Sequence, residues 1–145
     1  MRLARITGLA LFLLAVAPAS ALADAKSDVA AAYAAWDAAF NKGDAKAVAS
    51  AYTSNARVLP PTHVVATGPA EIEKFFAGLF ASGVTGHKLV IIDAGGDDKI
   101  VYATANWSAQ GKGKDGSPQP LGGIATHVFE RQTDGSLKLR LHTFN

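Results

Sequence analysis

The sequence predicts an α+β fold, with helices in the first half of the chain and an antiparallel sheet in the second. Apolar residues in the first half recur at helical steps of three and four, whereas the second half consists of β-rich runs separated by turns that contain Gly and Asp. The length of 145 residues and the hydrophobic content of 49% fit one small globular domain. Helices that cover one face of such a meander form an α+β arrangement.

The N-terminal segment 1–23 has the pattern of a secretory signal peptide. Arg2 and Arg5 precede an apolar run over 6–17, and small residues follow up to an A-x-A cleavage motif at 21–23. The run is shorter than the roughly 20 residues that cross a bilayer, which argues against the alternative of an uncleaved membrane anchor. We therefore expect export to the periplasm or the medium, and a mature domain over 24–145 without membrane contact.

The composition excludes several classes of protein. The chain contains no cysteine, which rules out a disulfide scaffold and a thiolate metal site. Without Arg2 and Arg5, the 14 basic residues fall to 12, equal to the 12 acidic residues. A neutral domain without a cluster of Lys and Arg does not fit nucleic-acid binding. We therefore expect no nucleic-acid partner.

Three helices are expected before the sheet. The first ends near Gly43, and Asp44 caps a short second helix that runs to about Tyr52. The third begins at Gly68-Pro69, with proline at the first helical position. The apolar stripe of the first helix consists of Val29, Tyr33, Trp36 and Phe40, and that of the third consists of Ile72, Phe75, Phe76, Leu79 and Phe80. The large apolar face of the third helix must lie against a flat surface.

The remaining segments are predicted to be strands. A brief strand at 57–59 ends at Pro60-Pro61, because proline cannot donate to a ladder, and 64–67 returns beside it. Four longer strands follow at 87–93, 99–110, 121–132 and 137–144, with turns at 95–98 and 134–135 and a polar loop at 111–120. Leu89–Ile92 is apolar on both faces, and an open sheet needs cover on its second face, so we expect a homodimer.

Several short motifs, in this order and spacing, resemble the nuclear transport factor 2-like superfamily. They are Tyr33-Ala34-Ala35-Trp36, Gly43-Asp44, Ala51-Tyr52, Arg57-Val58-Leu59-Pro60-Pro61, Gly68-Pro69-Ala70-Glu71-Ile72 and Asp134-Gly135. The chain is similar to small exported members of unknown function, which are related to polyketide cyclases, ketosteroid isomerases and the association domain of calcium/calmodulin-dependent kinases. The resemblance implies a curved antiparallel sheet wrapped around the N-terminal helices, a cone-shaped, cystatin-like roll that often holds a pocket and often dimerises through the sheet.

The resemblance also implies that one known reaction is absent. Steroid isomerases of the family carry a basic aspartate at the end of the first strand, before a proline, where this chain has Val58-Leu59-Pro60-Pro61. The tyrosine that polarises the substrate carbonyl falls near Trp36, whose indole N–H is too weakly acidic to share a proton with an oxyanion. We therefore do not expect enolisation by the isomerase route.

A polar but nearly uncharged pocket is the predicted binding site. The resemblance implies that positions with pocket-facing arginines in the kinase association domains fall on Asn106 and His127, and strand alternation places Tyr102 on the face of Asn106. The predicted ligand-binding residues are Trp36, Leu59, Phe76, Tyr102, Asn106 and His127. Such a pocket would suit a neutral or weakly acidic small molecule.

His127 and His63 are the candidate catalytic residues. A histidine titrates near neutrality and can act as an acid or a base. The alternative for His127 is a core histidine bonded to a neighbour, and for His63 a solvated loop residue. His142 lies in the last predicted strand, and His87 is interpreted as a surface residue at a strand end. The four histidines lack the spacing of metal ligands, so we expect no metal and no cofactor.

Three classes of function remain open from the sequence. The leading interpretation is an exported domain that binds a small molecule of unknown identity in a largely apolar pocket. The second is a lyase, isomerase or cyclase that uses His127 or His63 as acid or base, with Tyr102 and Asn106 as hydrogen-bond donors. The third is a structural or interaction module whose cone is filled by its own side chains. A cavity in the structure would separate the first two classes from the third.

Overall fold

The computed structural model describes residues 19–145, so the predicted signal peptide lies outside the described residues up to position 18. The elements in chain order are α1 (Ala19–Asn41), α2 (Ala45–Ser50), β1 (Tyr52–Leu59), β2 (Ala66–Thr67), α3 (Gly68–Ala81), β3 (Thr85–Gly96), β4 (Ile100–Lys112), β5 (Pro118–Arg131) and β6 (Leu137–Phe144). Residues 19–23, which we assigned to the leader, begin α1. None of the described helices is long and apolar enough to cross a membrane.

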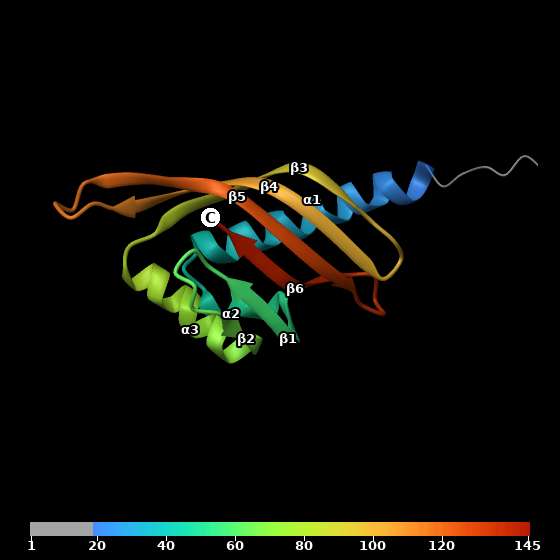
Figure 1. Ribbon diagram of the computed structural model, residues 1–145, viewed down its shortest axis with the longest axis horizontal. Helices are drawn as coiled ribbons and strands as arrows, with labels where there is room; N and C mark the ends of the chain where they lie inside the picture. Colours follow the sequence, from blue (N-terminus) through green and yellow to red (C-terminus); the bar gives the residue numbers. More distant parts are fainter. Residues whose placement is uncertain (1–18) are drawn as a thin grey trace, which may run out of the picture.

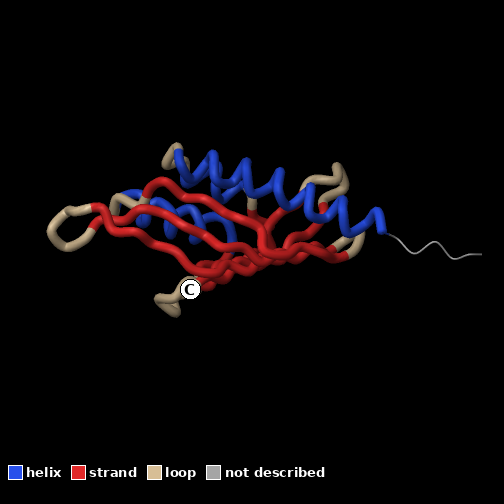
Figure 2. The backbone as a smooth tube through the Cα atoms, turned by 90° about the horizontal axis from the view of Figure 1, so that it is seen from above, coloured by secondary structure: helices blue, strands red, loops and turns tan. Residues whose placement is uncertain are grey.

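The six strands form one sheet in the order β2-β1-β6-β5-β4-β3. Neighbouring strands are antiparallel, except for the parallel pair β1 and β6. The sheet is curved, and α1 runs diagonally along it (Figure 1). The helices cover one face of the sheet, as Figure 2 shows from above. The predicted α+β class, with a curved sheet around N-terminal helices, is confirmed.

Several strand boundaries differ from the prediction, and β3 runs to Gly96, into the predicted turn at 95–98. β1 begins at Tyr52 rather than near Arg57, because it pairs with β6 from Tyr52 onward. β4 and β5 extend through most of the predicted loop 111–120, with Pro118 opposite Lys112. Before Ile124, β5 pairs only with β4. From Ile124 onward its other side is also paired, first with Asn145 and then with β6. The prolines of β5 therefore lie on a free edge, where a missing N–H costs no ladder bond.

The helix stripes pack against the inner face of the sheet. The stripe residues of α1 (Val29, Tyr33, Trp36 and Phe40) and two residues of α3 (Ile72 and Phe76) are at most 5% exposed. On β4, Val101, Ala103 and Ala105 are fully buried and alternate with residues that are exposed or half-buried. The short alanine side chains leave room above the sheet, and the larger rings of the helices occupy part of it. The rest of that space forms a cavity.

Candidate functional site

An inner cavity of about 150 Å³ lies between the helices and the curved sheet. Two of the residues that line it are histidines, and the others are aliphatic or aromatic. The lining consists of Trp36, Phe40, Phe76, Leu79, Val84, His87, Leu89, Trp107, Ala109, Leu121, Ala125, His142 and Phe144. The space between the helices and the sheet is therefore a largely apolar pocket.

Two side chains one helical turn apart on α1 hold the start of β3. Oδ1 of Asp37 lies 2.7 Å from Nδ1 of His87, and Oδ2 accepts a hydrogen bond from the backbone N–H of Leu89 at 3.0 Å. The side-chain amide of Asn41 donates to the backbone carbonyl of His87 at 2.8 Å and accepts from its N–H at 2.7 Å. Residues four apart share one face of a helix, so both side chains act on the same strand end. The backbone and the ring of His87 are thereby fixed together.

Aromatic rings surround the imidazole of His87. Its centroid lies 4.9 Å from that of Trp36, 4.7 Å from that of Phe40 and 6.1 Å from that of Trp107, whose plane is nearly parallel. The side chain of His87 is only 9% exposed. The expectation that His87 is a surface residue was wrong, because Asp37 compensates a polar ring that would otherwise be costly to bury. A carboxylate–imidazole pair is thus built into an apolar wall.

Two further histidines lie directly opposite each other on β5 and β6. The rings of His127 and His142 have centroids 4.4 Å apart. The hydroxyl of Tyr33 lies 2.6 Å from Nδ1 of His127, and the hydroxyl of Tyr52 lies 2.8 Å from Nδ1 of His142. Burial, with a smaller contribution from His87, lowers the pKa of His127 to about 3. Burial, followed by the charges of the other two histidines, also lowers the pKa of His142 well below its usual value. Both rings are therefore neutral at neutral pH.

The two tyrosines that bond these histidines keep their protons. Burial raises the pKa of the phenols of Tyr33 and Tyr52 far above their usual value, and the carboxylate of Asp37 adds to the effect at Tyr33. The indole of Trp36 approaches the Tyr52 hydroxyl and offsets part of the rise there. The two groups do not meet in hydrogen-bond geometry. In the described part of the chain, Nε1 of Trp36 is therefore the one buried side-chain nitrogen or oxygen that has no hydrogen-bond partner.

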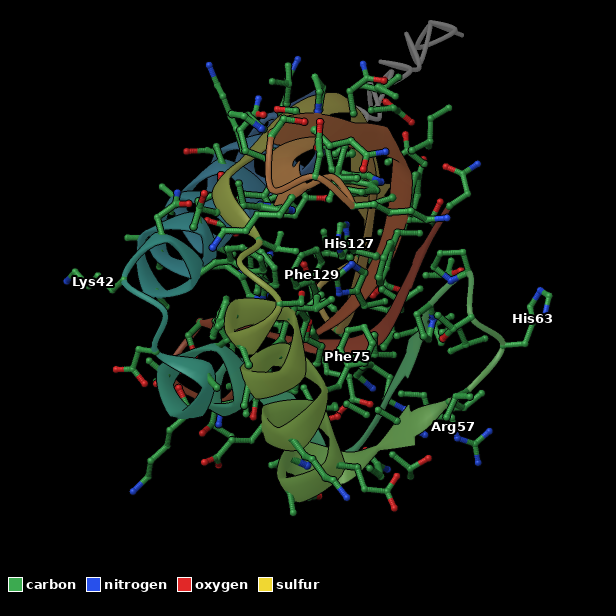
Figure 3. The ribbon with its side chains drawn as sticks, turned by 90° about the vertical axis from the view of Figure 1, so that its left-hand side faces the viewer. Lys42, Arg57, His63, Phe75, His127 and Phe129 are labelled. Atoms are coloured by element: carbon green, nitrogen blue, oxygen red, sulfur yellow. The ribbon has the colours of Figure 1, made fainter. Side chains whose placement is uncertain are left out.

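The structure separates the predicted ligand-binding residues into four places. Trp36 and Phe76 line the inner cavity. His127 lines a second hollow of about 290 Å³, the helix-side groove, which it shares with Trp36, Tyr33 and residues of α2. Figure 3 shows His127 and Phe129 inside the molecule, under the curved sheet. The other three predicted residues lie elsewhere.

Tyr102 and Asn106 do not face the same side of the sheet as His127. Both are exposed on the outer face, Tyr102 by 46%. The strand register pairs His127 with Ala103, and residues directly opposite each other share a face, so His127 points inward with Ala103. The expectation that Tyr102, Asn106 and His127 form one pocket was therefore wrong. A displacement of one residue in the assumed alignment is enough to reverse the face of a strand residue.

Leu59 and His63 border a shallow depression that shares only Phe144 with the lining of the inner cavity. The depression lies at the end of β1 and is lined also by Pro60, Pro61 and the C-terminal residues. His63 is exposed and has a φ of 62°, and its backbone N–H donates to the carbonyl of Pro60. Its side chain points away from the molecule in Figure 3. The loop alternative describes His63 better than a catalytic role.

The sequence analysis missed four residues of this region: Tyr33, Asp37, Tyr52 and His87. The only local signal for the pair with His87 was the spacing of Asp37 and Asn41, which places two polar side chains on one flank of an apolar helix. Their partner lies 50 positions away from Asp37, and no sequence period connects the two. Among residues 19–145, no group of three or more His, Asp or Glu side chains is arranged to hold a metal ion.

Comparison with known proteins identifies the family of this chain. The model of the SnoaL-like domain matches residues 31–139. The chain belongs to the SnoaL-like domain family. No curated protein matches this SnoaL-like domain in sequence.

Solved structures share the fold of this SnoaL-like domain at low sequence identity. A ketosteroid isomerase-like protein from Erwinia carotovora has 18% identity and a TM-score of 0.72, over 87% of this chain and 95% of that chain. An NTF2-like protein with a cystatin-like fold from Novosphingobium aromaticivorans has 16% identity and a TM-score of 0.70, over 85% and 82%. An NTF-2 like protein of unknown function from Shewanella oneidensis has 14% identity and a TM-score of 0.68, over 82% and 97%. The likeness concerns the fold alone.

Proposed function

We propose that this SnoaL-like domain binds a small apolar molecule, about the size of one aromatic ring, in the inner cavity. The cavity itself carries the proposal, since it measures about 150 Å³ and its lining is apolar apart from two histidines. An apolar cavity of about 150 Å³ in a protein core is large enough to hold benzene. The cavity also supports binding over a filled interaction module, because packed interiors leave few voids larger than a water molecule.

Binding can be tested with toluene as the probe and a variant that fills the cavity. Ala109 lines the cavity and is 3% exposed, so Ala109→Leu places three more carbon atoms in the space that the probe would occupy. The matched control is Ala38→Leu, the same change at an exposed position of α1. Nuclear Overhauser effects from toluene to the indole protons of Trp36 and Trp107 are expected in the parent and in Ala38→Leu, and are expected to vanish in Ala109→Leu. Their absence from the parent would refute the proposal.

A second copy of the chain is proposed to cover the outer face of the sheet. Five large apolar side chains there are 44–51% exposed: Val90, Ile92, Ile100, Tyr102 and Ile124. On β4 and β5, the outer-facing residues of the central part of the sheet carry no charge: Tyr102, Thr104 and Asn106 with their partners Val128, Thr126 and Ile124. The exposed Asp93 of β3 lies beside them, opposite Thr104. A symmetric copy centred on β4 and β5 therefore places uncharged side chains against uncharged side chains. Light scattering of residues 24–145 is expected to give the mass of two chains at micromolar concentration.

Export and cleavage after Ala23 are also proposed, on the order of charged, apolar and small residues at the N-terminus. Expression of the full chain in a bacterium, followed by mass spectrometry of the periplasmic fraction, is expected to return a protein that begins at Asp24. A protein that retains Met1 and stays in the cytoplasmic fraction would contradict this.

An acid/base enzyme is the second candidate function, and the Asp37–His87 pair favours it. Of the histidines that we first named, His127 is held neutral by burial and His63 lies at an exposed loop away from the inner cavity. His87 is the histidine that both lines the cavity and contacts a carboxylate.

A further inference from the structure

A second hollow, the outer depression, lies over β1, β6 and β5 on the face of the sheet that the helices do not cover. Its lining combines two arginines, a threonine and an asparagine with two aliphatic residues: Asn55, Arg57, Thr67, Val128, Arg140 and Leu141. The outer depression measures about 440 Å³, more than the roughly 150 Å³ that holds one benzene ring. None of these residues lines the inner cavity, so the two sites are separate.

The register of the sheet explains why four of these side chains meet. Thr67, Arg57, Leu141 and Val128 lie directly opposite one another on β2, β1, β6 and β5. Residues directly opposite on neighbouring strands share a face of the sheet. Arg57 and Thr67 are exposed, so the whole row belongs to the outer face. The half-buried Leu141 and Val128 form an apolar floor between Arg57 and the centre of the sheet.

Irregular strand pairing brings Arg140 to the same place. It lies between Leu139 and Leu141, which pair with consecutive residues of β5, so Arg140 is the extra residue of a β-bulge. On its other side, the segment 53–56 of β1 lies opposite this one residue. Nη1 of Arg140 donates to the backbone carbonyl of Asn55 in that segment, at 3.1 Å. The bulge and this hydrogen bond together hold Arg140 at the border of the outer depression.

The carboxylates near the outer depression leave the charge of Arg57 uncompensated. Oε1 of Glu130 lies 3.3 Å from Nε of Arg140, and Oε2 of Glu71 accepts a hydrogen bond from the backbone N–H of Thr67 at 2.8 Å. Within residues 19–145, Arg57 takes part in none of the ion pairs. Its side chain is exposed and points outward from β1 in Figure 3, so solvent and solutes reach it. An arginine keeps its charge throughout the physiological pH range, so this site needs no titration.

We propose that the outer depression binds a small aryl or alkyl carboxylate, with the carboxylate group on Arg57 and the apolar group on Leu141 and Val128. A guanidinium group presents two parallel N–H donors that match the two oxygens of a carboxylate. Arg140 adds a second positive charge, which Glu130 compensates in part. Two arginines and one glutamate leave a single positive charge, which suits a monoanion. This site is independent of the proposed binding in the inner cavity.

The probes for this proposal are 4-fluorobenzoate and its neutral counterpart 4-fluorobenzamide. They have the same ring and nearly the same shape, and the ¹⁹F chemical shift of each reports the bound fraction in a titration. The benzoate is expected to bind about fivefold more tightly, which is the upper range for an exposed ion pair. This advantage is expected to shrink from about 50 to about 500 mM NaCl, because salt screens exposed charges. Nuclear Overhauser effects to the methyl groups of Leu141 and Val128 are expected to locate the bound ring.

Two matched pairs of variants test the charges of the site. Arg57→Gln is expected to abolish the advantage of the benzoate. Lys42→Gln removes the same charge from an exposed residue on the other side of the molecule (Figure 3) and is expected to keep that advantage. Glu130→Gln frees the guanidinium group of Arg140 and is expected to tighten benzoate binding about twofold. Glu73→Gln makes the same change at an exposed position of α3 and is expected to leave benzoate binding unchanged.

Each outcome decides the whole proposal or the role of one residue. If the benzoate binds no better than the benzamide, or does not bind, the outer depression is refuted as a carboxylate site, whatever toluene does in the inner cavity. Benzoate binding that Arg57→Gln leaves unchanged would refute the role of Arg57, and an unchanged Glu130→Gln would refute that of Arg140. If the benzoate does not bind and Arg57→Gln converts a dimer into a monomer in light scattering, the arginine contacts a second copy, and the proposal of a small ligand is overturned.

Discussion

Acid is expected to destabilise this domain through its two buried histidines. His127 is 1% exposed, and its pKa of about 3 lies far below that of a histidine in an unfolded chain, about 6.5. Between these two pKa values, the unfolded state therefore binds a proton at His127 and the folded state does not. The stability that this group contributes is complete above pH 6.5 and is lost progressively as the pH falls from 6.5 toward 3. His142 is shifted in the same direction and acts with the same sign.

The magnitude follows from the two pKa values of His127. One proton taken up on unfolding changes the free energy of unfolding by about 1.4 kcal/mol per pH unit. The unfolded histidine is half protonated at pH 6.5, so between pH 6.5 and pH 4.5 His127 removes about 2 kcal/mol of stability. Typical domains are stable by about 5–15 kcal/mol in total, so this loss is large enough to measure. His142 adds to it, although the two rings interact and do not titrate independently.

The assay is urea unfolding between pH 7.5 and 4.5, followed by the fluorescence of Trp36 and Trp107. In His127→Gln the amide can still bond Tyr33 but cannot titrate, so the stability difference between parent and variant should shrink by about 3 kcal/mol across this range. Contributions from carboxylates are common to both proteins and cancel. His63→Gln is the control, since that side chain is exposed on a loop. Curves for the parent and His127→Gln that run parallel would refute the reasoning.

Three further changes test the packing of the fold. Ile124→Lys places a charge on the outer face and is expected to convert a dimer into a folded monomer, as light scattering and circular dichroism would show; a variant that stays dimeric contradicts the interface. Phe76→Ala removes a ring that is 2% exposed and should cost about 3–5 kcal/mol in urea unfolding, more than Phe75→Ala on the half-buried flank. Gly96→Ala should lower the free energy of unfolding by about 3 kcal/mol, because Gly96 has a φ of 142° and an added Cβ would lie 2.2 Å from the carbonyl oxygen of Ile100. An unchanged midpoint of urea unfolding would show that the turn adapts.

The spacing of residues predicted most of the secondary structure of this domain. The stripes of α1 and α3 follow from steps of three and four, and Gly68-Pro69 marks the start of α3. The prolines of β5 show where local rules fail. The polar stretch 111–120, which contains two of them, was predicted as a loop. Whether a proline is tolerated in a strand depends on whether its nitrogen, which carries no hydrogen, faces a neighbouring strand. That neighbour is set by the order of strands in the sheet, which local spacing does not contain.

The candidate site required the tertiary structure for a similar reason. The sequence alone determined that α1 carries Trp36 on its apolar stripe, that the chain has no thiol chemistry, and that strand residues alternate between two faces. It could not determine which face of β4 and β5 is inside, because this depends on a register that one residue reverses. For that reason Tyr102 and Asn106 were predicted in the pocket, although they lie on the outer face of the sheet. Asp37 and His87 meet only because the sheet curves until β3 reaches the flank of α1, and contact at 2.7 Å between residues 50 positions apart is a property of the packed molecule.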